Sequence, residues 1–291
     1  MKLALVALAL VGCTQGGGAN PYACMAAGGA GCFELPTAPI AAITNVPDTT
    51  PELDCPPYEV VQSAAPRTLR GSTFYTVTVE PARDVDVELF ADAERTVSLG
   101  QTASDESADF QIDVASLPNL VAARTTKDGF LPHVHLYERL DLGLPRLGLL
   151  TATQAQLDER LRSVGDRFLP NRSQLTVLAL DCSDTPISGA IVNIAPVSGK
   201  HGSRLFVPDV RVYYTGDDAQ PSRRTELTQT ETRPEVHVSN VPEGHYFVQL
   251  WGFLTEHDML LGPQALKLLD EVEITITPGE AMYFAPLRAR I

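Results

Sequence analysis

The sequence predicts an all-β fold of two β-sandwich domains, joined by a linker that contains one short α-helix. Three observations predict this fold. Apolar and polar residues alternate with a period of two in many short runs, as in strands with one buried face. Turn residues separate these runs at intervals of roughly 8 to 12 residues, a spacing typical of sandwiches. One stretch, within residues 141–171, has a helical period instead.

The first sandwich is expected within residues 67–140. Apolar side chains occupy every second position of its predicted strands, so each strand turns one face to a core. These strands are Tyr75–Val79, Val85–Ala91, Phe110–Val114 and His133–Tyr137.

The linker, residues 141–171, is predicted to contain a helix that packs across or between the two domains. Thr151 and Gln154 have the spacing of a capping box at its start. Three apolar residues then share one helix face: Leu157, Leu161 and Val164. Gly165 suits the position just after the helix.

The second sandwich is expected within residues 172–291. Its predicted strands lie at Leu175–Val177, Ile191, Val210–Tyr214, Val236–Val238, Tyr246–Leu250, Val272–Ile276 and Met282–Leu287. A further helix over 259–269 is disfavoured by Gly262 and Pro263.

The N-terminus has the pattern of a secretory signal, residues 1–12. The apolar run Leu3–Val11 is shorter than the roughly 20 residues of a membrane span, and Lys2 supplies the usual positive end. The four residues that end at Cys13, Leu-Val-Gly-Cys, resemble the bacterial lipobox. The resemblance implies cleavage before Cys13 and acylation of that residue. A plain secretory signal or an N-terminal core strand are the alternatives.

Lipidation of Cys13 implies an exported protein that acyl chains attach to the membrane of the cell envelope. In enteric bacteria an Asp after the cysteine signals retention in the inner membrane, so Thr14 favours the outer membrane. Residues 13–66 are then expected to form a Gly- and Ala-rich flexible tether, followed by an irregular proline-rich segment.

Four cysteines remain if Cys13 carries lipid. They are Cys24, Cys32, Cys55 and Cys182. An even number in an oxidising compartment predicts two disulfides, with three possible connectivities. A Cys24–Cys32 pair would close a short loop, and a Cys55–Cys182 pair would then tie the N-terminal segment to the second sandwich.

The chain is acidic, with 22 Lys and Arg against 36 Asp and Glu, and a net charge of −14. Nucleic-acid binding needs a basic face, and the sequence contains no cluster of Lys and Arg. The acidity therefore indicates solubility in an exported protein, with cation binding as the alternative, and nucleic acid is not an expected partner.

The second sandwich resembles the carboxypeptidase regulatory-like, or transthyretin-like (prealbumin-like), β-sandwich family. The resemblance rests on Asp181–Val192, which contains a Pro/Gly turn and Gly-Ala-x-Val, and on the Val-Pro-x-Gly-x-Tyr phrase at 241–246. The first sandwich resembles the same family at 104–110 and 127–132, although Ala108 stands where the family has glycine. The resemblance implies that the phrase at 241–246 forms a hairpin, that the other phrases form turns, and that the domains are not catalytic.

His133 and His135 are the candidate metal ligands, because residues i and i+2 of a strand point to the same side. Intradiol dioxygenases, which have a related fold, bind iron through a His-x-His pair and two tyrosines, and Tyr137 shares the face of this pair. The alternative is that the three residues form the outer face of a strand whose inner face is Val134 and Leu136.

Four aromatic residues are candidates for a platform that binds carbohydrate or peptide: Tyr213, Tyr214, Trp251 and Phe253. A core position is the alternative for Trp251. The sequence thus predicts a lipid-anchored, non-enzymatic envelope protein, without a cofactor, for binding or structural display. Its expected partners are the membrane and an envelope protein or carbohydrate. A metal-dependent enzyme at His133 and His135 is the alternative.

Overall fold

The computed structural model describes residues 41–46, 49–55, 62–63, 66–76, 78–139, 146–169, 171–197, 201–202, 207, 210–215, 235–262, 265–277, 279–280 and 282–291. The all-β prediction is confirmed, because strands dominate these residues and the helices among them are the short α1 (Gln154–Ser163) and α2 (Glu256–Leu261). The signal peptide and Cys13, Cys24 and Cys32 lie outside the described residues.

The first half of the chain forms the strands β2 (Gln62–Ser63), β3 (Arg67–Tyr75), β4 (Asp86–Phe90), β5 (Ser98–Ala103), β6 (Asp109–Val114), β7 (Leu117–Pro118), β8 (Leu120–Thr126), β9 (His133–Arg139) and β10 (Leu147–Thr151). The second half, with one N-terminal strand, forms β1 (Thr44–Asn45), β11 (Arg172–Leu180), β12 (Ile187–Ser188), β13 (Ile191–Pro196), β14 (Arg211–Tyr214), β15 (Glu235–Pro242), β16 (Gly244–Gly252), β17 (Lys267–Ile276) and β18 (Met282–Arg288).

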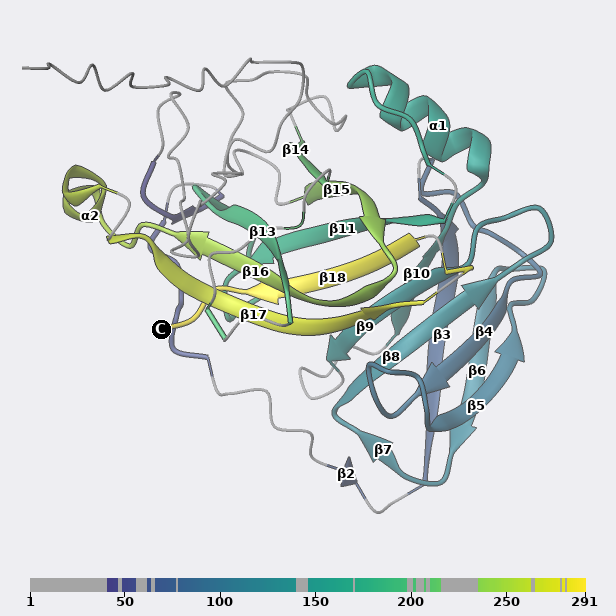
Figure 1. Cartoon of the computed structure of the whole chain (residues 1–291). Coiled ribbons are helices and arrows are strands. Elements are labelled where there is room, and N and C mark those ends of the chain that lie inside the picture. The colour runs from purple at the N-terminus through teal and green to yellow at the C-terminus, as the bar shows by residue number, and fades with distance from the viewer. Residues whose placement is uncertain are drawn as a thin grey trace, which may run out of the picture.

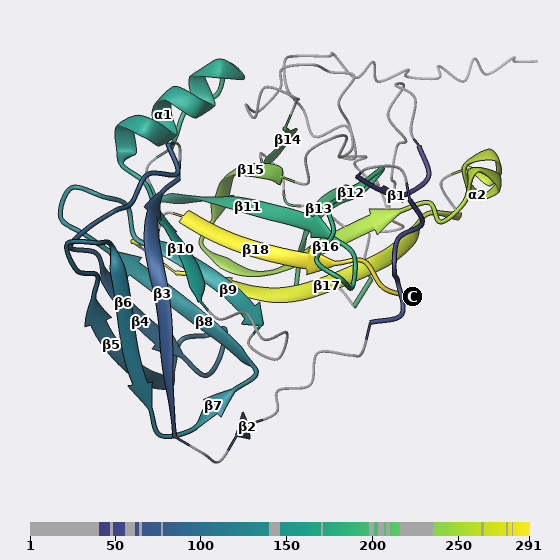
Figure 2. The same cartoon turned by 180° about the vertical axis from the view of Figure 1, so that it is seen from behind.

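One eight-stranded sheet runs through both halves, in the order β14-β15-β11-β18-β9-β8-β4-β5 (Figures 1 and 2). The C-terminal strand β18 lies at its centre and pairs in parallel with both β11 and β9. The junction with β9 places Met282 opposite His133 and Phe284 opposite His135. Backbone hydrogen bonds therefore join the two predicted sandwiches directly.

Two three-stranded sheets, β10-β3-β6 and β13-β16-β17, pack on different parts of this long sheet. The first sheet and strands β4 and β8 enclose a core that includes Leu89, Phe110 and Leu149. The second sheet and strands β11, β15 and β18 enclose a larger core around Val177, Leu250 and Tyr283. We call these two parts of the protein the first unit and the second unit.

The region predicted as a linker contains both a strand and the predicted helix. Strand β10 pairs in parallel with β3 and contributes to the first core, so this part of 141–171 belongs to the first unit. The capping box of α1 is formed by Thr153 and Gln156, two residues after the expected pair. The apolar face is confirmed at Leu157 and Leu161, which are buried.

The hairpin that the resemblance implied at 241–246 is wrong, because the phrase reverses the chain without joining two paired strands. Strand β15 pairs with β11 and β14, whereas β16 pairs with β13 and β17. The turn at Glu243 therefore carries the chain from one sheet to the other. Tyr246 closes it by donating a hydrogen bond to the Glu243 carbonyl, 3.2 Å away.

The turn at 104–110 forms although it lacks the family's glycine. The Asp105 carboxylate accepts hydrogen bonds from the backbone amides of Ser107 and Asp109, at 2.8 and 3.0 Å. Ala108 adopts a positive φ of 63°, a conformation that glycine adopts at lower cost. The hydrogen bonds of Asp105 thus hold Ala108 in the conformation that the family reaches with glycine.

A disulfide between Cys55 and Cys182 attaches the N-terminal segment to the second unit, which confirms one of the pairings left open by the sequence. Beside it, the buried Asp181 carboxylate accepts hydrogen bonds from Asn45 and from the Glu52 amide, both at 3.1 Å. The Cys182 amide also donates to the Glu52 carbonyl. Residues 49–55 are thus held by covalent and polar contacts.

Among the described residues, neither helix is long and apolar enough to cross a membrane.

Candidate functional site

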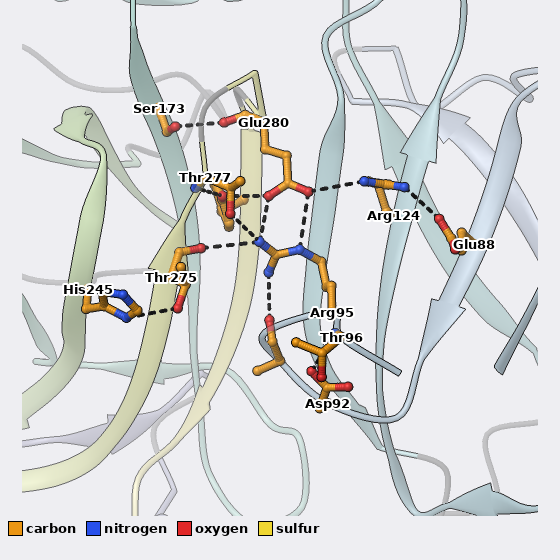
Figure 3. Close-up of polar contacts among 12 residues, drawn as sticks. Glu88, Asp92, Arg95, Thr96, Arg124, Ser173, His245, Thr275, Thr277 and Glu280 are labelled. Carbon is orange, nitrogen blue, oxygen red and sulfur yellow. Dashed lines mark hydrogen bonds and ion pairs between the residues drawn. The ribbon is translucent and has the colours of Figure 1, made fainter. Parts of the chain in front are cut away.

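The first and second units meet at a buried ion pair between Arg95 and Glu280 (Figure 3). Arg95 lies in the turn between β4 and β5, and Glu280 lies in the turn between β17 and β18. Their side chains are only 5% and 8% exposed. The same β4–β5 turn inserts Ala93 into the core of the second unit. The contact is therefore part of the protein interior.

The geometry of this pair is bidentate. Arg95 donates from Nε to Oε1 of Glu280 at 3.2 Å and from Nη2 to Oε2 at 2.6 Å. It also donates to Thr277 Oγ1 at 2.9 Å and to the Ala93 carbonyl at 2.6 Å. Fork-to-fork pairing of this kind is the strongest hydrogen-bonded arrangement of arginine and a carboxylate.

Glu280 has two further partners on the second unit. Tyr283 donates its phenol hydrogen to Glu280 Oε2 at 2.9 Å and accepts a hydrogen bond from the Thr277 amide at 2.9 Å. Burial, followed by the charge of Glu280, raises the pKa of the Tyr283 phenol. The Ser173 hydroxyl donates to the Glu280 carbonyl at 2.7 Å. Tyr283 thus holds the carboxylate of Glu280, and Ser173 holds its backbone, in the position that pairs with Arg95.

The turn that carries Arg95 is also fixed in place. The Asp92 carboxylate accepts hydrogen bonds from the amides of Thr96 and Val97, at 2.9 and 2.8 Å. Burial raises the pKa of this carboxyl, but the two amides outweigh burial and hold it below its ordinary value. Arg95 itself has a positive φ of 59°. The turn thus aims a long cationic side chain at the second unit.

Arg124, on β8, extends the buried pair toward the surface. It forms an ion pair with Glu88 at 2.6 Å, and its Nη1 lies 3.6 Å from Glu280 Oε1 (Figure 3). Its side chain is 38% exposed and borders an open, largely polar groove of about 450 Å³ on strands β4, β5 and β8, together with Glu88 and Gln101. Charged side chains therefore contact one another in a continuous series from this groove to the buried pair between the units.

Sequence reasoning did not find this site. Arg95 and Glu280 are 185 residues apart, and each lies in a turn with no recognisable motif. Nothing in the periodicity distinguishes them from the other charged residues of the chain. Chemically, the cluster pairs opposite charges across the contact between the two units.

The prediction of an outer, solvent-facing strand face at His133 and His135 is wrong. The two side chains are 1% and 0% exposed, and Val134 and Leu136 on the other face are also buried. The imidazole rings lie 4.7 Å apart, and His135 Nε2 accepts a hydrogen bond from the Leu150 amide of β10 at 2.8 Å. Strand β10 therefore covers the face that the sequence assigned to solvent.

The described residues contain no group of three or more His, Cys, Asp or Glu side chains placed to hold a metal ion. The structure therefore brings the two predicted ligands together but adds no third described ligand of these types. No described hydrogen-bond partner reaches either ring nitrogen of His133. The Tyr137 side chain lies outside the described part of the structure.

Two buried histidines, His133 and His237, have pKa values that their surroundings lower. Burial, the neighbouring His135 and then Arg160 lower the pKa of His133 well below its ordinary value. Burial and then Arg160 do the same to His237, whose Nδ1 lies 3.3 Å from Thr176 Oγ1. Arg160 belongs to α1 and has Glu235 as its compensating charge.

Acid should destabilise the protein through these two histidines. Their pKa values in the folded state lie below the unfolded-state value of about 6.5, so the unfolded chain binds more protons as the pH falls through that value. The free energy of unfolding should fall from about pH 6.5 downward, with a limiting slope of about 1.4 kcal/mol per pH unit for each histidine. Urea unfolding at pH 7.5 and 5.5 measures the difference.

A His133→Gln/His237→Gln variant should show a flatter pH dependence over this range. A His257→Gln variant is the matched control, because His257 is exposed on α2. The raised pKa of the buried Asp270 acts with the opposite sign and is common to all three proteins. An equal pH dependence in the unaltered protein and in the His133→Gln/His237→Gln variant would contradict the assignment.

The four aromatic residues suggested as a platform are core residues. Tyr213, Tyr214, Trp251 and Phe253 are 7%, 1%, 4% and 1% exposed. Polar atoms of two of them form hydrogen bonds inside the protein. Tyr214 accepts a hydrogen bond from the Val192 amide, and Trp251 Nε1 donates one to Gln249. They do not form an exposed surface for a sugar or a peptide.

No protein-family model matches the chain, and no curated protein matches it significantly. Solved structures with which it can be aligned include the Bacillus anthracis TIE protein, at 9% identity and a TM-score of 0.23. Others are the Streptococcal ancillary pilin (13%, 0.23) and the shaft pilin spaA of Lactobacillus rhamnosus GG (8%, 0.22). Each alignment covers 78% of this chain, and 34%, 63% and 98% of the other chain, respectively. TM-scores this low identify no shared fold.

Proposed function

We propose that this chain is a lipid-anchored protein of the bacterial cell envelope with a structural, non-enzymatic role. In this role the two units form one rigid body, and a tether that is fixed to the membrane attaches this body to the cell envelope. The buried Arg95–Glu280 pair is the observation that supports the proposal most strongly, because it joins the units inside the protein rather than at a mobile surface contact. The continuous sheet through β18 and β9 supports the same role.

The anchor is the part of this proposal that the sequence supports, through the lipobox ending at Cys13. A Cys13→Ser variant should accumulate as an uncleaved or soluble precursor, because the modified thiol is missing. Fractionation of cells that express the two forms, with the apparent mass of each, measures this. Cys24→Ser is the matched control and should remain in the membrane fraction. Normal processing and membrane fractionation of Cys13→Ser would refute lipid anchoring, and separation of inner from outer membranes tests the preference for the outer one.

We further propose that the units are relatives of the carboxypeptidase regulatory-like, transthyretin-like sandwiches. The tight turn at Gly189, with a φ of 80°, and the turn closed by Tyr246 support this kinship. Partners in the envelope, protein or carbohydrate, would then meet loops or edge strands. The outermost strands of the long sheet, β14 and β5, are the described candidates.

A metal-dependent enzyme at His133 and His135 has less support, because both imidazoles are buried and no third described residue completes a site. Elemental analysis of the purified protein distinguishes the two functions. One equivalent of iron or zinc that disappears in a His133→Ala/His135→Ala variant would favour the enzyme and overturn the structural role.

A further inference from the structure

The short helix α2 carries two exposed large apolar side chains of the second unit, in which Ile291 is also exposed. Leu260 is 85% exposed and Leu261 is 49% exposed. Both views show α2 projecting at the end of the protein that lies away from the first unit (Figures 1 and 2). Neither leucine belongs to the buried core, so the pair presents an apolar surface to whatever lies outside the protein.

Local contacts define both ends of α2 and the direction of its side chains. Its first turn is closed by a capping box in which the Asp258 carboxylate accepts a hydrogen bond from the Thr255 amide at 3.0 Å. The chain leaves the helix at Gly262, which has a φ of 85°. Met259 packs against the core of the second unit, and this contact turns Leu260 and Leu261 outward.

The chain enters the described fold beside this helix. The Ile43 amide donates to the Phe253 carbonyl at 2.9 Å, only two residues before the helix cap. The Ile43 side chain packs so closely on Gly252 that a Cβ there would lie 2.6 Å from it. The described N-terminal segment and α2 also lie at the same end of the protein in both views. Residues before Ala41 therefore reach the fold at the α2 end.

This position limits how far α2 can be from the anchor. Residues 14–40 separate Cys13 from Ala41. That number of residues spans at most about 100 Å when fully extended, and it joins the fold at the α2 end. A lipidated Cys13 would thus bring the α2 end, rather than the first unit, toward the lipid surface.

We propose that Leu260 and Leu261 dock on the membrane and so orient the anchored protein with its first unit outward. The occupant is a lipid surface with zwitterionic headgroups, because Glu256 lies one helical turn from Leu260 and the whole chain has a charge of −14. Acidic groups oppose docking on an anionic surface. The proposal rests on the lipid anchor proposed above.

Tryptophan fluorescence of the full, lipid-modified chain in phosphatidylcholine vesicles tests this docking. The one native tryptophan, Trp251, is 4% exposed and gives a constant background. A Leu260→Trp variant places a second tryptophan at the helix tip. A Val79→Trp variant is the matched control, because Val79 is 66% exposed and follows β3 in the first unit.

Dibrominated acyl chains in the vesicles should quench Leu260→Trp several-fold more than Val79→Trp. Adding Leu261→Ser to the Leu260→Trp variant should reduce that quenching. Protein that floats with the vesicles but shows equal quenching at both positions overturns the docking while leaving the anchor intact. Protein that does not float overturns the anchor and the docking together. Fluorescence of the Leu260→Trp variant that changes with protein concentration but not with bromine indicates a second copy as the occupant and also overturns the proposal.

Discussion

Replacing Arg95 with methionine should lower the free energy of unfolding by about 3–5 kcal/mol. The substitution leaves the Glu280 carboxylate buried with its hydrogen bond from Tyr283 but without its bidentate partner, while the partly exposed Arg124 lies 3.6 Å away. A buried charge that loses its direct partner is costly because water does not reach it and the remaining opposite charge makes only a longer contact. Urea or guanidinium unfolding of the purified protein measures the loss.

Two further variants separate this explanation from a general packing defect. Arg95→Met/Glu280→Met removes both charges and should recover much of the lost stability, since an apolar pair of similar volume can replace a buried ion pair. Arg124→Met is the control for a partly exposed cation: Arg124 pairs with Glu88 near the surface and makes only a 3.6 Å contact with Glu280, so the loss should be about 1 kcal/mol. Similar losses for Arg95→Met and Arg124→Met would show that burial of the Arg95 pair is unimportant.

Removing the Cys55–Cys182 disulfide should have an effect of similar size. The two residues are 127 positions apart. Loop-closure entropy for a chain of that length corresponds to about 5 kcal/mol, and measured losses of native disulfides are about 2–5 kcal/mol. A Cys55→Ser/Cys182→Ser variant should therefore unfold at a clearly lower denaturant concentration than the unaltered protein.

Reductant provides the control for this experiment. It should lower the stability of the unaltered protein substantially and that of the double variant much less. Limited proteolysis adds a local readout: the variant should be cut more readily within residues 49–55, although Asp181 still accepts the Glu52 amide. An unchanged midpoint in the double variant would contradict the stabilising role of the disulfide.

The sequence predicted the features that depend on local periodicity. Alternation at Val87 and Leu89, and at Phe110 and Ile112, does mark strands with a buried face. The helical spacing of Leu157 and Leu161 marks the buried face of α1. Helix and strand periods are set by neighbouring residues, so one sequence is enough to find them.

The features that the sequence did not predict depend on pairing between distant segments. No local pattern indicates that β18 inserts between β11 and β9, because a parallel neighbour can come from any part of the chain. That insertion joins one sheet of each predicted sandwich into a single sheet of eight strands. The burial of His133 was missed for a related reason: alternation identifies two faces of a strand, but not that β10 covers the polar one.

Buried ion pairs are missed for a different reason. Arg95 and Glu280 look like solvated surface charges in the sequence, because each lies in a polar turn. They become partners only because the fold brings the two turns together.

The burial of Trp251 and Tyr214 also could not be predicted from the sequence. Large aromatic residues on strands suit either a core or an exposed binding surface, and in this protein they are buried.

Differential scanning calorimetry tests most directly whether the two units form one rigid body. A shared sheet, a buried ion pair and a disulfide should make them unfold together. We predict a single heat-absorption peak whose calorimetric and van't Hoff enthalpies are equal, a ratio of about 1. Two resolved peaks, or a calorimetric enthalpy well above the van't Hoff value, would mean that the units unfold independently and would contradict the rigid body on which the proposed structural role depends.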